Sequence, residues 1–247
     1  GAVTGQLWYD SSDSEFKYKY QAYGNAWSTG NSMNTARKEL GGAGTQTAAL
    51  AFGGRSPPGD TAITEQYDGS SWTEVNDLNT ARRNLGGAGT QTSALAFGGG
   101  PNLAITESWN GSSWTEVNDL NTGRENLGGA GADNTSAIAF AGSAAPGDSA
   151  ATELWNGTNW TEVNDLNTAR GSTGAAAGAF SSLLFFGGST PSGESNATES
   201  WNGTNWTEVN DLNTARSRAG ASGTVPAALC FGGGTPTATG VTEEWNG

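Results

Sequence analysis

One eleven-residue element recurs along this chain and limits its fold more than any other feature. It runs Trp-Thr-Glu-Val-Asn-Asp-Leu-Asn-Thr-Ala-Arg over residues 72–82 and returns, almost unchanged, over 114–124, 160–170 and 206–216. A diverged copy spans 27–37, and the tryptophans that open the copies lie 42–46 residues apart. A repeat of this length predicts an array of similar units, because one unit alone cannot bury its apolar face.

Each unit also contains an apolar stretch that ends in glycine, such as Leu95–Gly99, and then a Thr-Glu-x-aromatic stretch, such as Thr106–Trp109. Turn signals such as Asn110-Gly111 separate these stretches. In the second unit the pattern predicts four short strands, over 85–90, 93–97, 104–109 and 113–117. Four strands per unit of roughly 45 residues predict an all-β protein, a five-bladed β-propeller with four antiparallel strands per blade.

The fifth unit begins at Arg216 and reaches Gly247 after its third strand, while a spare fourth strand is predicted near Trp27. We therefore expect N- and C-terminal strands to share one blade and close the ring, which removes two exposed sheet edges. For the third strand of that blade, Val241–Trp245 is favoured over Phe16–Gln21, because it carries the repeated Thr-Glu-x-Trp. The expected organisation is an N-terminal hairpin or extension over 1–21 and a propeller over 22–247.

The units resemble the kelch-repeat family. The resemblance rests on apolar strands that end in Gly-Gly, as at Gly53-Gly54 and Gly98-Gly99, and on an aromatic residue followed shortly by tryptophan, as at Trp109 and Trp114. It covers roughly residues 22–247 and implies a propeller. The chain departs from the family at Ala141-Gly142, where a glycine pair is expected, and in having Trp where kelch repeats usually have Tyr. Five units are also fewer than the six or seven typical of kelch propellers.

The N-terminal segment follows a different pattern. Gly5-Gln-Leu-Trp-Tyr-Asp10 precedes a Lys-Tyr strand over 16–20 and then Trp27. This arrangement resembles a short hairpin element of bacteriophage virion and tail-fibre proteins. The resemblance implies a structural protein located in a virion or outside the cell, with other virion proteins or a host-surface glycan as partners.

Composition excludes several classes of chemistry. The chain has no His and a single Cys, Cys230, so histidine catalysis, thiolate metal clusters and intrachain disulfides are ruled out. Its net charge of −13 argues against a nucleic-acid partner, which requires a basic surface. No apolar run approaches the roughly 18 residues of a membrane span. We expect no enzyme activity, catalytic residue, metal or cofactor, and no insertion into a membrane.

One arginine and one glutamate recur in every unit. This recurrence has two interpretations: a ring of arginines that binds an anion, and structural Arg–Glu or Arg–carbonyl pairs between blades. The structural interpretation is favoured, because these residues recur in every unit although the loop sequences differ. The residues are Arg37, Arg82, Arg124, Arg170 and Arg216, with Glu65, Glu107, Glu153, Glu199 and Glu243.

A second set of carboxylates recurs in the fourth strand and the turn after it. Four equivalent copies do not resemble a single glycosidase pair, and their spacing does not resemble a calcium loop. We expect them to stabilise turns. They are Glu74, Glu116, Glu162 and Glu208, with Asp77, Asp119, Asp165 and Asp211.

The loops between the second and third strands differ in every unit. Strand alternation places them on one face with the nearly constant fourth-to-first connections, and variable loops on a rigid scaffold commonly carry binding. Drift at unconstrained positions is an equally good explanation. The candidate binding residues on these loops are Arg55, Asp60, Asn102, Asp148, Glu194 and Asn196.

Three hypotheses for function follow. The first is a non-enzymatic virion or tail-fibre propeller whose variable loops contact a protein or a host-surface glycan. The second is a soluble microbial lectin with sugar pockets between blades, lined by Trp109, Trp155 and Trp201. It depends on these tryptophans being exposed. The third, an enzyme, is disfavoured because the copper oxidases of kelch type need His ligands that this chain lacks.

Overall fold

The computed structural model describes residues 7–10, 15–18, 29–171, 175–235 and 237–247. The chain divides into two compact units, Gly1–Asn31 and Ser32–Gly247. In the first unit, strands β1 (Leu7–Asp10) and β2 (Glu15–Tyr18) form an antiparallel hairpin in which Leu7 pairs with Tyr18.

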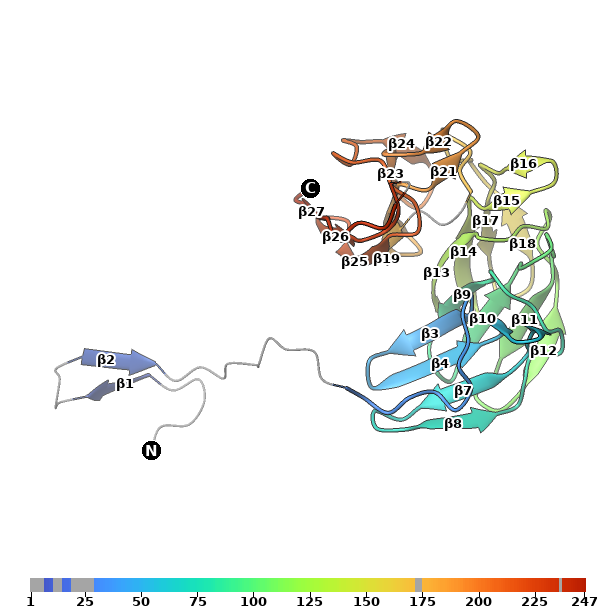
Figure 1. Ribbon diagram of the computed structural model, residues 1–247, viewed down its shortest axis with the longest axis horizontal. Coiled ribbons are helices and arrows are strands. Elements are labelled where there is room, and N and C mark those ends of the chain that lie inside the picture. Colours follow the sequence, from blue (N-terminus) through green and yellow to red (C-terminus); the bar gives the residue numbers. More distant parts are fainter. Residues whose placement is uncertain (1–6, 11–14, 19–28, 172–174, 236) are drawn as a thin grey trace. The chain divides into compact units, whose positions relative to one another are not determined.

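The larger compact unit, Ser32–Gly247, is a five-bladed β-propeller, and its sheets follow one another in chain order (Figure 1). The first sheet consists of β3 (Gly41–Thr45), β4 (Ala48–Phe52), β7 (Thr64–Tyr67) and β8 (Trp72–Val75). The second consists of β9 (Gly86–Gly89), β10 (Ala94–Phe97), β11 (Thr106–Trp109) and β12 (Trp114–Val117).

The third and fourth sheets repeat this order, and all neighbouring strands are antiparallel. The third contains β13 (Gly128–Asp133), β14 (Ser136–Phe140), β17 (Thr152–Trp155) and β18 (Trp160–Glu162). The fourth contains β19 (Ala175–Ala179), β20 (Ser182–Phe186), β23 (Thr198–Trp201) and β24 (Trp206–Glu208).

The fifth sheet has three strands within the described residues: β25 (Gly220–Thr224), β26 (Ala227–Phe231) and β27 (Thr242–Trp245). The predicted third strand, Val241–Trp245, is confirmed, because Thr242 pairs with Phe231 and Trp245 with Ala228. The strand predicted to complete this sheet and close the ring, near Trp27, lies outside the described residues.

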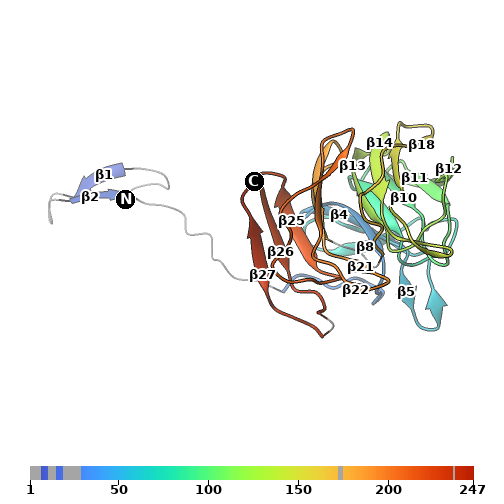
Figure 2. The ribbon, with the colours of Figure 1, turned by 90° about the horizontal axis from the view of Figure 1, so that it is seen from above.

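Three of the second-to-third loops carry a small two-stranded sheet of their own. These are β5 (Arg55–Ser56) with β6 (Gly59–Asp60), β15 (Ser143–Ala144) with β16 (Gly147–Asp148), and β21 (Ser189–Thr190) with β22 (Gly193–Glu194). Figure 2 shows β5 and β22 on the same side of the propeller.

The third strand of the second blade is shorter than predicted, because the carbonyls before it accept other hydrogen bonds. Ala104 and Ile105 precede β11 rather than belong to it. The Ile105 carbonyl accepts from Gly98 N–H and from the Arg82 guanidinium, and the Ala104 carbonyl accepts from Leu120 N–H. Loop and side-chain donors therefore take the carbonyls that a longer strand would use in its ladder.

Small residues in the first strands let successive sheets approach closely near the middle of the propeller. β9 contacts both β3 and β13, and β19 contacts both β13 and β25. A Cβ atom added to Gly87 would lie 2.8 Å from the Phe52 ring and 2.7 Å from the Gly42 carbonyl oxygen of the preceding sheet. Only glycine fits this contact, which accounts for the glycine-rich first strands.

The apolar core lies between sheets rather than inside any one of them. The cluster between the first two sheets joins Leu50 and Phe52 to Ala94, Trp109 and Trp114. The next two junctions repeat this arrangement with Phe97 beside Trp160 and with Phe140 beside Trp206. Over the described ranges there is no helix, and so none long and apolar enough to cross a bilayer.

Candidate binding face

The second-to-third loops and the fourth-to-first connections lie side by side, as strand alternation predicts. Each of four connections forms an antiparallel bridge with the loop of the blade it enters. The bridges are Lys38 with Arg55, Glu125 with Ser143, Gly171 with Ser189, and Ser217 with Gly234. Backbone hydrogen bonds such as Ser143 N–H to the Glu125 carbonyl, at 2.7 Å, hold the loops in place. We call this side of the propeller the loop face.

The six candidate binding residues all lie on the loop face, although the structure brings only two of them together. Arg55 and Asp60 are paired across the β5–β6 hairpin. Asn102 is an exposed residue with φ of 52° in a turn. Asp148 accepts from the Ser143 hydroxyl at 3.3 Å, and the Asn196 amide donates to the Leu212 carbonyl at 3.3 Å. Glu194 ends strand β22 and is half-buried.

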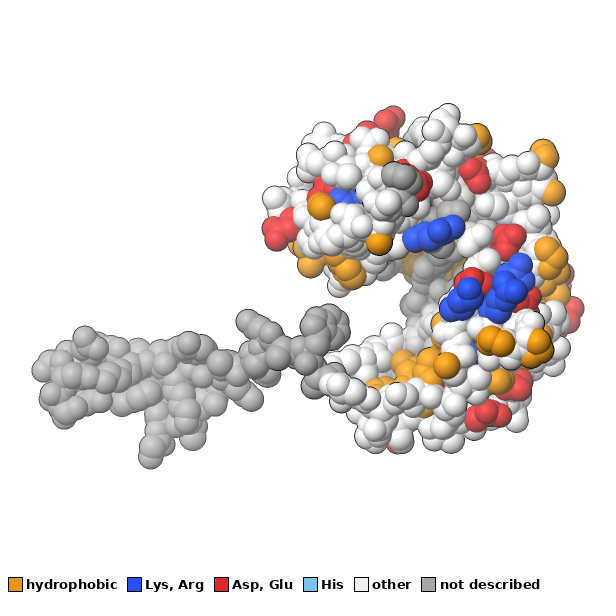
Figure 3. Space-filling view, in the orientation of Figure 1, with side chains coloured by type: hydrophobic (Ala, Val, Ile, Leu, Met, Phe, Trp, Pro, Cys, Tyr) orange, Lys and Arg blue, Asp and Glu red, His pale blue; other side chains and the backbone are white. Residues whose placement is uncertain are grey.

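Basic residues are concentrated on the loop face. Apart from the five repeated arginines, residues 32–247 contain four Lys or Arg residues: Lys38, Arg55, Arg83 and Arg218. Lys38, Arg55 and Arg218 belong to the loops and connections just described, and Arg83 lies in the connection that enters the second blade, where its carbonyl accepts from Gly100 N–H at 2.8 Å. Figure 3 shows Lys and Arg side chains gathered beside Asp and Glu side chains on one face of the protein. An otherwise acidic propeller therefore has its accessible positive charge in one region.

Arg83 links two blades on this face. Its Nη1 donates to both carboxylate oxygens of Asp60, at 3.0 and 2.8 Å, and its Nε lies 3.6 Å from the Glu39 carboxylate. The Asp60 hydrogen bond and charge raise the pKa of Arg83, so this guanidinium stays charged. Arg55 and Arg218 are exposed, and neither side chain has an ion pair among the described residues.

A cavity of about 560 Å³ opens among the connections. Asn84 N–H donates to the Glu39 carbonyl at 2.8 Å, and Asn126 N–H donates to the Asn84 carbonyl at 2.9 Å. These residues and Arg218 have φ between 53° and 60°, so each turns its backbone in the left-handed conformation. The cavity lining combines Arg218, Glu39 and the two asparagines with leucines, and it offers both charge and hydrogen-bond donors.

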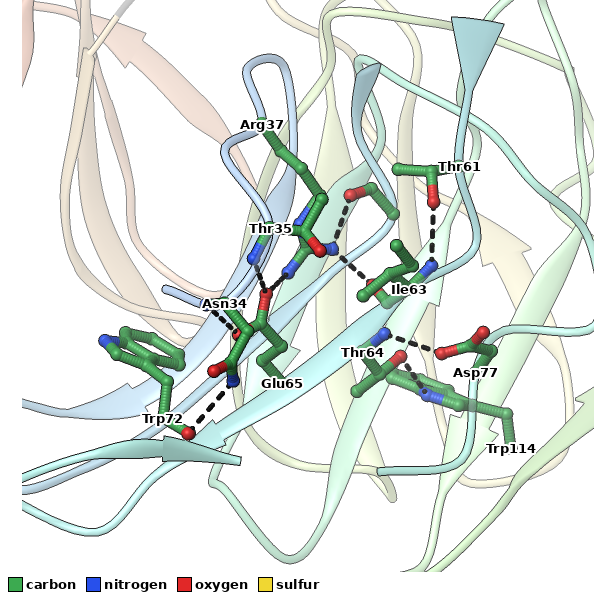
Figure 4. A network of polar contacts seen from close by, with 11 residues as sticks. Asn34, Thr35, Arg37, Thr61, Ile63, Thr64, Glu65, Trp72, Asp77 and Trp114 are labelled. Atoms are coloured by element: carbon green, nitrogen blue, oxygen red, sulfur yellow. Dashed lines mark hydrogen bonds and ion pairs between the residues drawn. The ribbon is translucent and has the colours of Figure 1, made fainter. Parts of the chain in front are cut away.

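The repeated arginines and glutamates form buried networks that join each connection to the blade it enters (Figure 4). In the first blade, Arg37 Nη2 lies 3.0 Å from Glu65 Oε1, and both side chains are fully buried. Arg37 Nη1 donates to the Gly53 carbonyl at 2.9 Å and to the Ile63 carbonyl. Asn34 completes the network, because its backbone N–H donates to Glu65 Oε2 at 2.7 Å.

The other blades repeat this network. The ion pairs are Arg82–Glu107 at 3.4 Å, Arg124–Glu153 at 2.8 Å, Arg170–Glu199 at 2.7 Å, and Arg216–Glu243. Burial lowers the pKa of Arg82, Arg124 and Arg170, while the facing glutamates act in the opposite direction. These guanidinium groups are inaccessible and already paired, so they do not form an open anion-binding ring.

The second set of carboxylates also has structural contacts. Asp77 accepts from Thr64 N–H at 3.0 Å, and the contact recurs between Asp119 and Thr106, Asp165 and Thr152, and Asp211 and Thr198. Each aspartate therefore holds the start of a third strand. Within the described ranges, no group of three or more Asp, Glu or Cys residues could hold a metal ion.

The proposed sugar-stacking tryptophans are not available to a ligand. Trp109, Trp155 and Trp201 are 0%, 3% and 1% exposed. Their indole N–H groups donate to the carbonyls of Gln91, Asn134 and Phe180 at 2.9–3.1 Å. These rings belong to the core between blades, and the expectation that they line sugar pockets is wrong.

The basic and amide residues of the connections are absent from the candidates named above, because the fourth-to-first connections are nearly constant in sequence up to the buried arginine. The two residues after each buried arginine do vary: Lys-Glu after Arg37, Arg-Asn after Arg82, Glu-Asn after Arg124, Gly-Ser after Arg170, and Ser-Arg after Arg216. The variation at these two positions, directly after an arginine that recurs in every unit, is the sequence feature that could have identified these residues.

No protein-family model matches this chain, and no curated protein matches it. The resemblances to kelch repeats and to phage proteins therefore rest on the quoted residues alone.

Proposed function

We propose that this protein is a non-enzymatic binding and structural module, a kelch-like propeller of a phage virion or tail fibre, whose loop face contacts a partner that presents negative charge. The observation that carries the proposal is the placement of Lys38, Arg55, Arg83 and Arg218 on one face of a protein with net charge −13. A local positive potential on an otherwise acidic protein favours binding to an acidic patch of another virion protein or to an acidic host-surface glycan.

The construction of the face supports the same proposal. Variable hairpins such as β5–β6 are held by backbone bridges to a scaffold that repeats in every blade. A rigid scaffold lowers the entropy that loops lose on binding, and several weak contacts on one face add through avidity. The kelch assignment is supported by the Gly-Gly strand ends, and the virion assignment by the N-terminal segment with its Trp-Tyr-Asp strand.

The alternative of a soluble microbial lectin loses its main support, since the tryptophans it needs are buried. Carbohydrate binding on the loop face would depend on charge and amide groups instead, as around Arg218 and Asn126. That chemistry suits acidic sugars better than neutral ones.

The test is a binding screen of the full chain against acidic and neutral glycans, intact bacterial cells and candidate virion proteins. An Arg55→Gln/Arg218→Gln variant is expected to lose most binding, and wild-type binding is expected to weaken as ionic strength rises. A Lys17→Gln/Lys19→Gln variant is the matched control, because it removes the same charge from residues 1–31. Equal loss in both variants, or salt-independent binding, would contradict the proposal.

A further inference from the structure

Two cations lie directly opposite each other where the chain enters the first blade. Lys38 N–H donates to the Arg55 carbonyl at 3.1 Å, and Arg55 N–H donates to the Lys38 carbonyl at 2.8 Å. Residues that exchange both backbone hydrogen bonds in this way project their side chains from the same face, and like charges in such a pair repel. The other three bridges between connections and loops in the described chain pair no two charges of like sign.

The nearby carboxylates do not neutralise this pair, because Arg83 binds them as well. Asp60 faces Arg55 across the β5–β6 hairpin, but both of its carboxylate oxygens accept from Arg83 Nη1, at 3.0 and 2.8 Å. One Glu39 oxygen lies 3.5 Å from Lys38 Nζ, and the other lies 3.6 Å from Arg83 Nε. Three cations therefore share two carboxylates at ion-pair distance, and the Arg55 guanidinium has no ion-pair partner among the described residues.

A cavity of about 610 Å³ opens beside the pair. Lys38 and Arg55 line it together with Pro57 and Pro58, which are both exposed. The Lys38 side chain is itself 70% exposed, so its ammonium group is accessible to a ligand. The cavity thus combines two accessible cations with the apolar surface of two proline rings, and its size is typical of a small-molecule site.

The backbone around the cavity disfavours a peptide as the ligand. Strand β5 has β6 on one side and Lys38 on the other, so neither edge is open at Arg55. A peptide that binds by strand addition has no main-chain partner here. The ligand must therefore be recognised by its charge and by contact with the prolines.

Charge and oxygen count select the class of anion. A phosphate monoester carries about two negative charges at pH 7 and has three acceptor oxygens. The planar Arg55 guanidinium can bind two of these oxygens while the Lys38 ammonium binds the third. A carboxylate has one charge and two oxygens, which a guanidinium alone satisfies, and a sulfate ester has three oxygens but a single charge.

We propose that Lys38 and Arg55 form a binding site for the phosphate monoester of a sugar, with Pro57 and Pro58 against the apolar face of the sugar ring. The inference rests on the proposed function, because it names the negatively charged group that the loop face recognises on a host-surface glycan. It differs from that function in assigning the group to one cavity of the first blade.

Calorimetric titration of the full chain with glucose 6-phosphate at low ionic strength tests the site. Lys38→Gln and Arg55→Gln are each expected to weaken binding about tenfold, because each removes a charged hydrogen-bond donor. Lys17→Gln removes the same charge from β2 in the other compact unit and should leave the affinity unchanged. Equal affinities in the wild type and the two site variants would overturn the proposal, as would an equal loss in all three variants.

Three further ligands test the chemical class. Glucose 6-sulfate and glucuronate are expected to bind the wild type at least several-fold more weakly than glucose 6-phosphate. Glucuronate that binds as tightly would overturn the assignment of a doubly charged group. A phosphoserine peptide that binds more tightly than glucose 6-phosphate would overturn the assignment to a sugar and point to a phosphorylated protein.

Competition separates this inference from the proposed function. Glucose 6-phosphate is expected to displace the acidic partner found in the binding screen. If that partner binds in a salt-dependent way and glucose 6-phosphate neither binds nor competes, the phosphate site is wrong and the proposed function stands. If glucose 6-phosphate binds through Lys38 and Arg55 while no glycan, cell or virion protein binds, the site stands and the proposed function is wrong.

Discussion

The indole of Trp160, on the outer strand of the third blade, donates a hydrogen bond of 2.9 Å to the hydroxyl of Thr106 in the second blade. The two residues are 54 positions apart, and both side chains are buried. The bond joins neighbouring blades at a point where water cannot substitute for either partner, so its loss should be measurable.

Thr106→Val leaves the Trp160 N–H buried without an acceptor, and we expect it to lower the free energy of unfolding by about 1–3 kcal/mol. Thr106→Ser retains the hydroxyl and should recover most of this loss. Urea unfolding followed by tryptophan fluorescence measures both variants. A valine variant as stable as the wild type would show that the bond contributes nothing.

Glu153→Leu removes the carboxylate that Arg124 and Asn121 share. The Arg124 charge is then buried without its partner, and the expected loss is about 3–5 kcal/mol. Glu162 lies opposite Glu153 in the ladder but is exposed. Glu162→Leu is the matched control, expected to stay within about 0.5 kcal/mol of wild type. Similar losses in both variants would contradict the assignment of the buried pair.

Gly86→Ala tests the close approach at the first strand of the second blade. The new Cβ would lie 2.3 Å from a ring carbon of Phe97, so the ring must shift, at a cost of about 1–3 kcal/mol. Gly59 in the β5–β6 hairpin has no heavy atom within 4 Å of the same position, and Gly59→Ala should be neutral. Thermal unfolding of the two variants compares crowded and open glycines directly.

Asp68 occupies the turn position at which three other blades have Asn110, Asn156 and Asn202. Hydrogen bonds from Ser71 and Ser70 lower the pKa of its carboxyl from 3.8 to about 2. A depressed folded-state pKa contributes stability above pH 3.8 and loses it as the pH falls towards 2. Asp68→Asn should keep the turn and remove this pH dependence. Thermal midpoints of the two proteins are therefore expected to converge as the pH falls from 5 to 2, and parallel curves would refute the assignment.

The sequence predicted the strands and the blades well because the information is local and repeated. Tight turns such as Asn110–Ser113 and the apolar run Ala94–Phe97 carry clear signals, and five copies reinforce them. The first residue of the third strand in the second blade was less predictable. It depends on which distant N–H group donates to a carbonyl, as the Leu120 N–H does to the Ala104 carbonyl.

The candidate binding face was only partly predictable for the same reason. Variation located Arg55 and Asp60 on a loop, but nothing local indicated that Arg83, 23 residues further on, would bind Asp60. Burial was also hidden from the sequence. A core position is the commoner one for a residue such as Trp109, but the sequence alone could not exclude a ligand platform until its surroundings in two blades were known.

The threonine–tryptophan contacts all point in one rotational direction, with donors on the later blade and acceptors on the earlier one. A stretch copied in frame from one repeated arginine to the next therefore carries both a donor and an acceptor, one for the blade on each side. The contact is the same at each of three junctions, whichever two blades it joins: Trp114 with Thr64, Trp160 with Thr106, and Trp206 with Thr152. Tandem duplication or deletion of such a stretch would therefore preserve this contact between the blades on either side of the change.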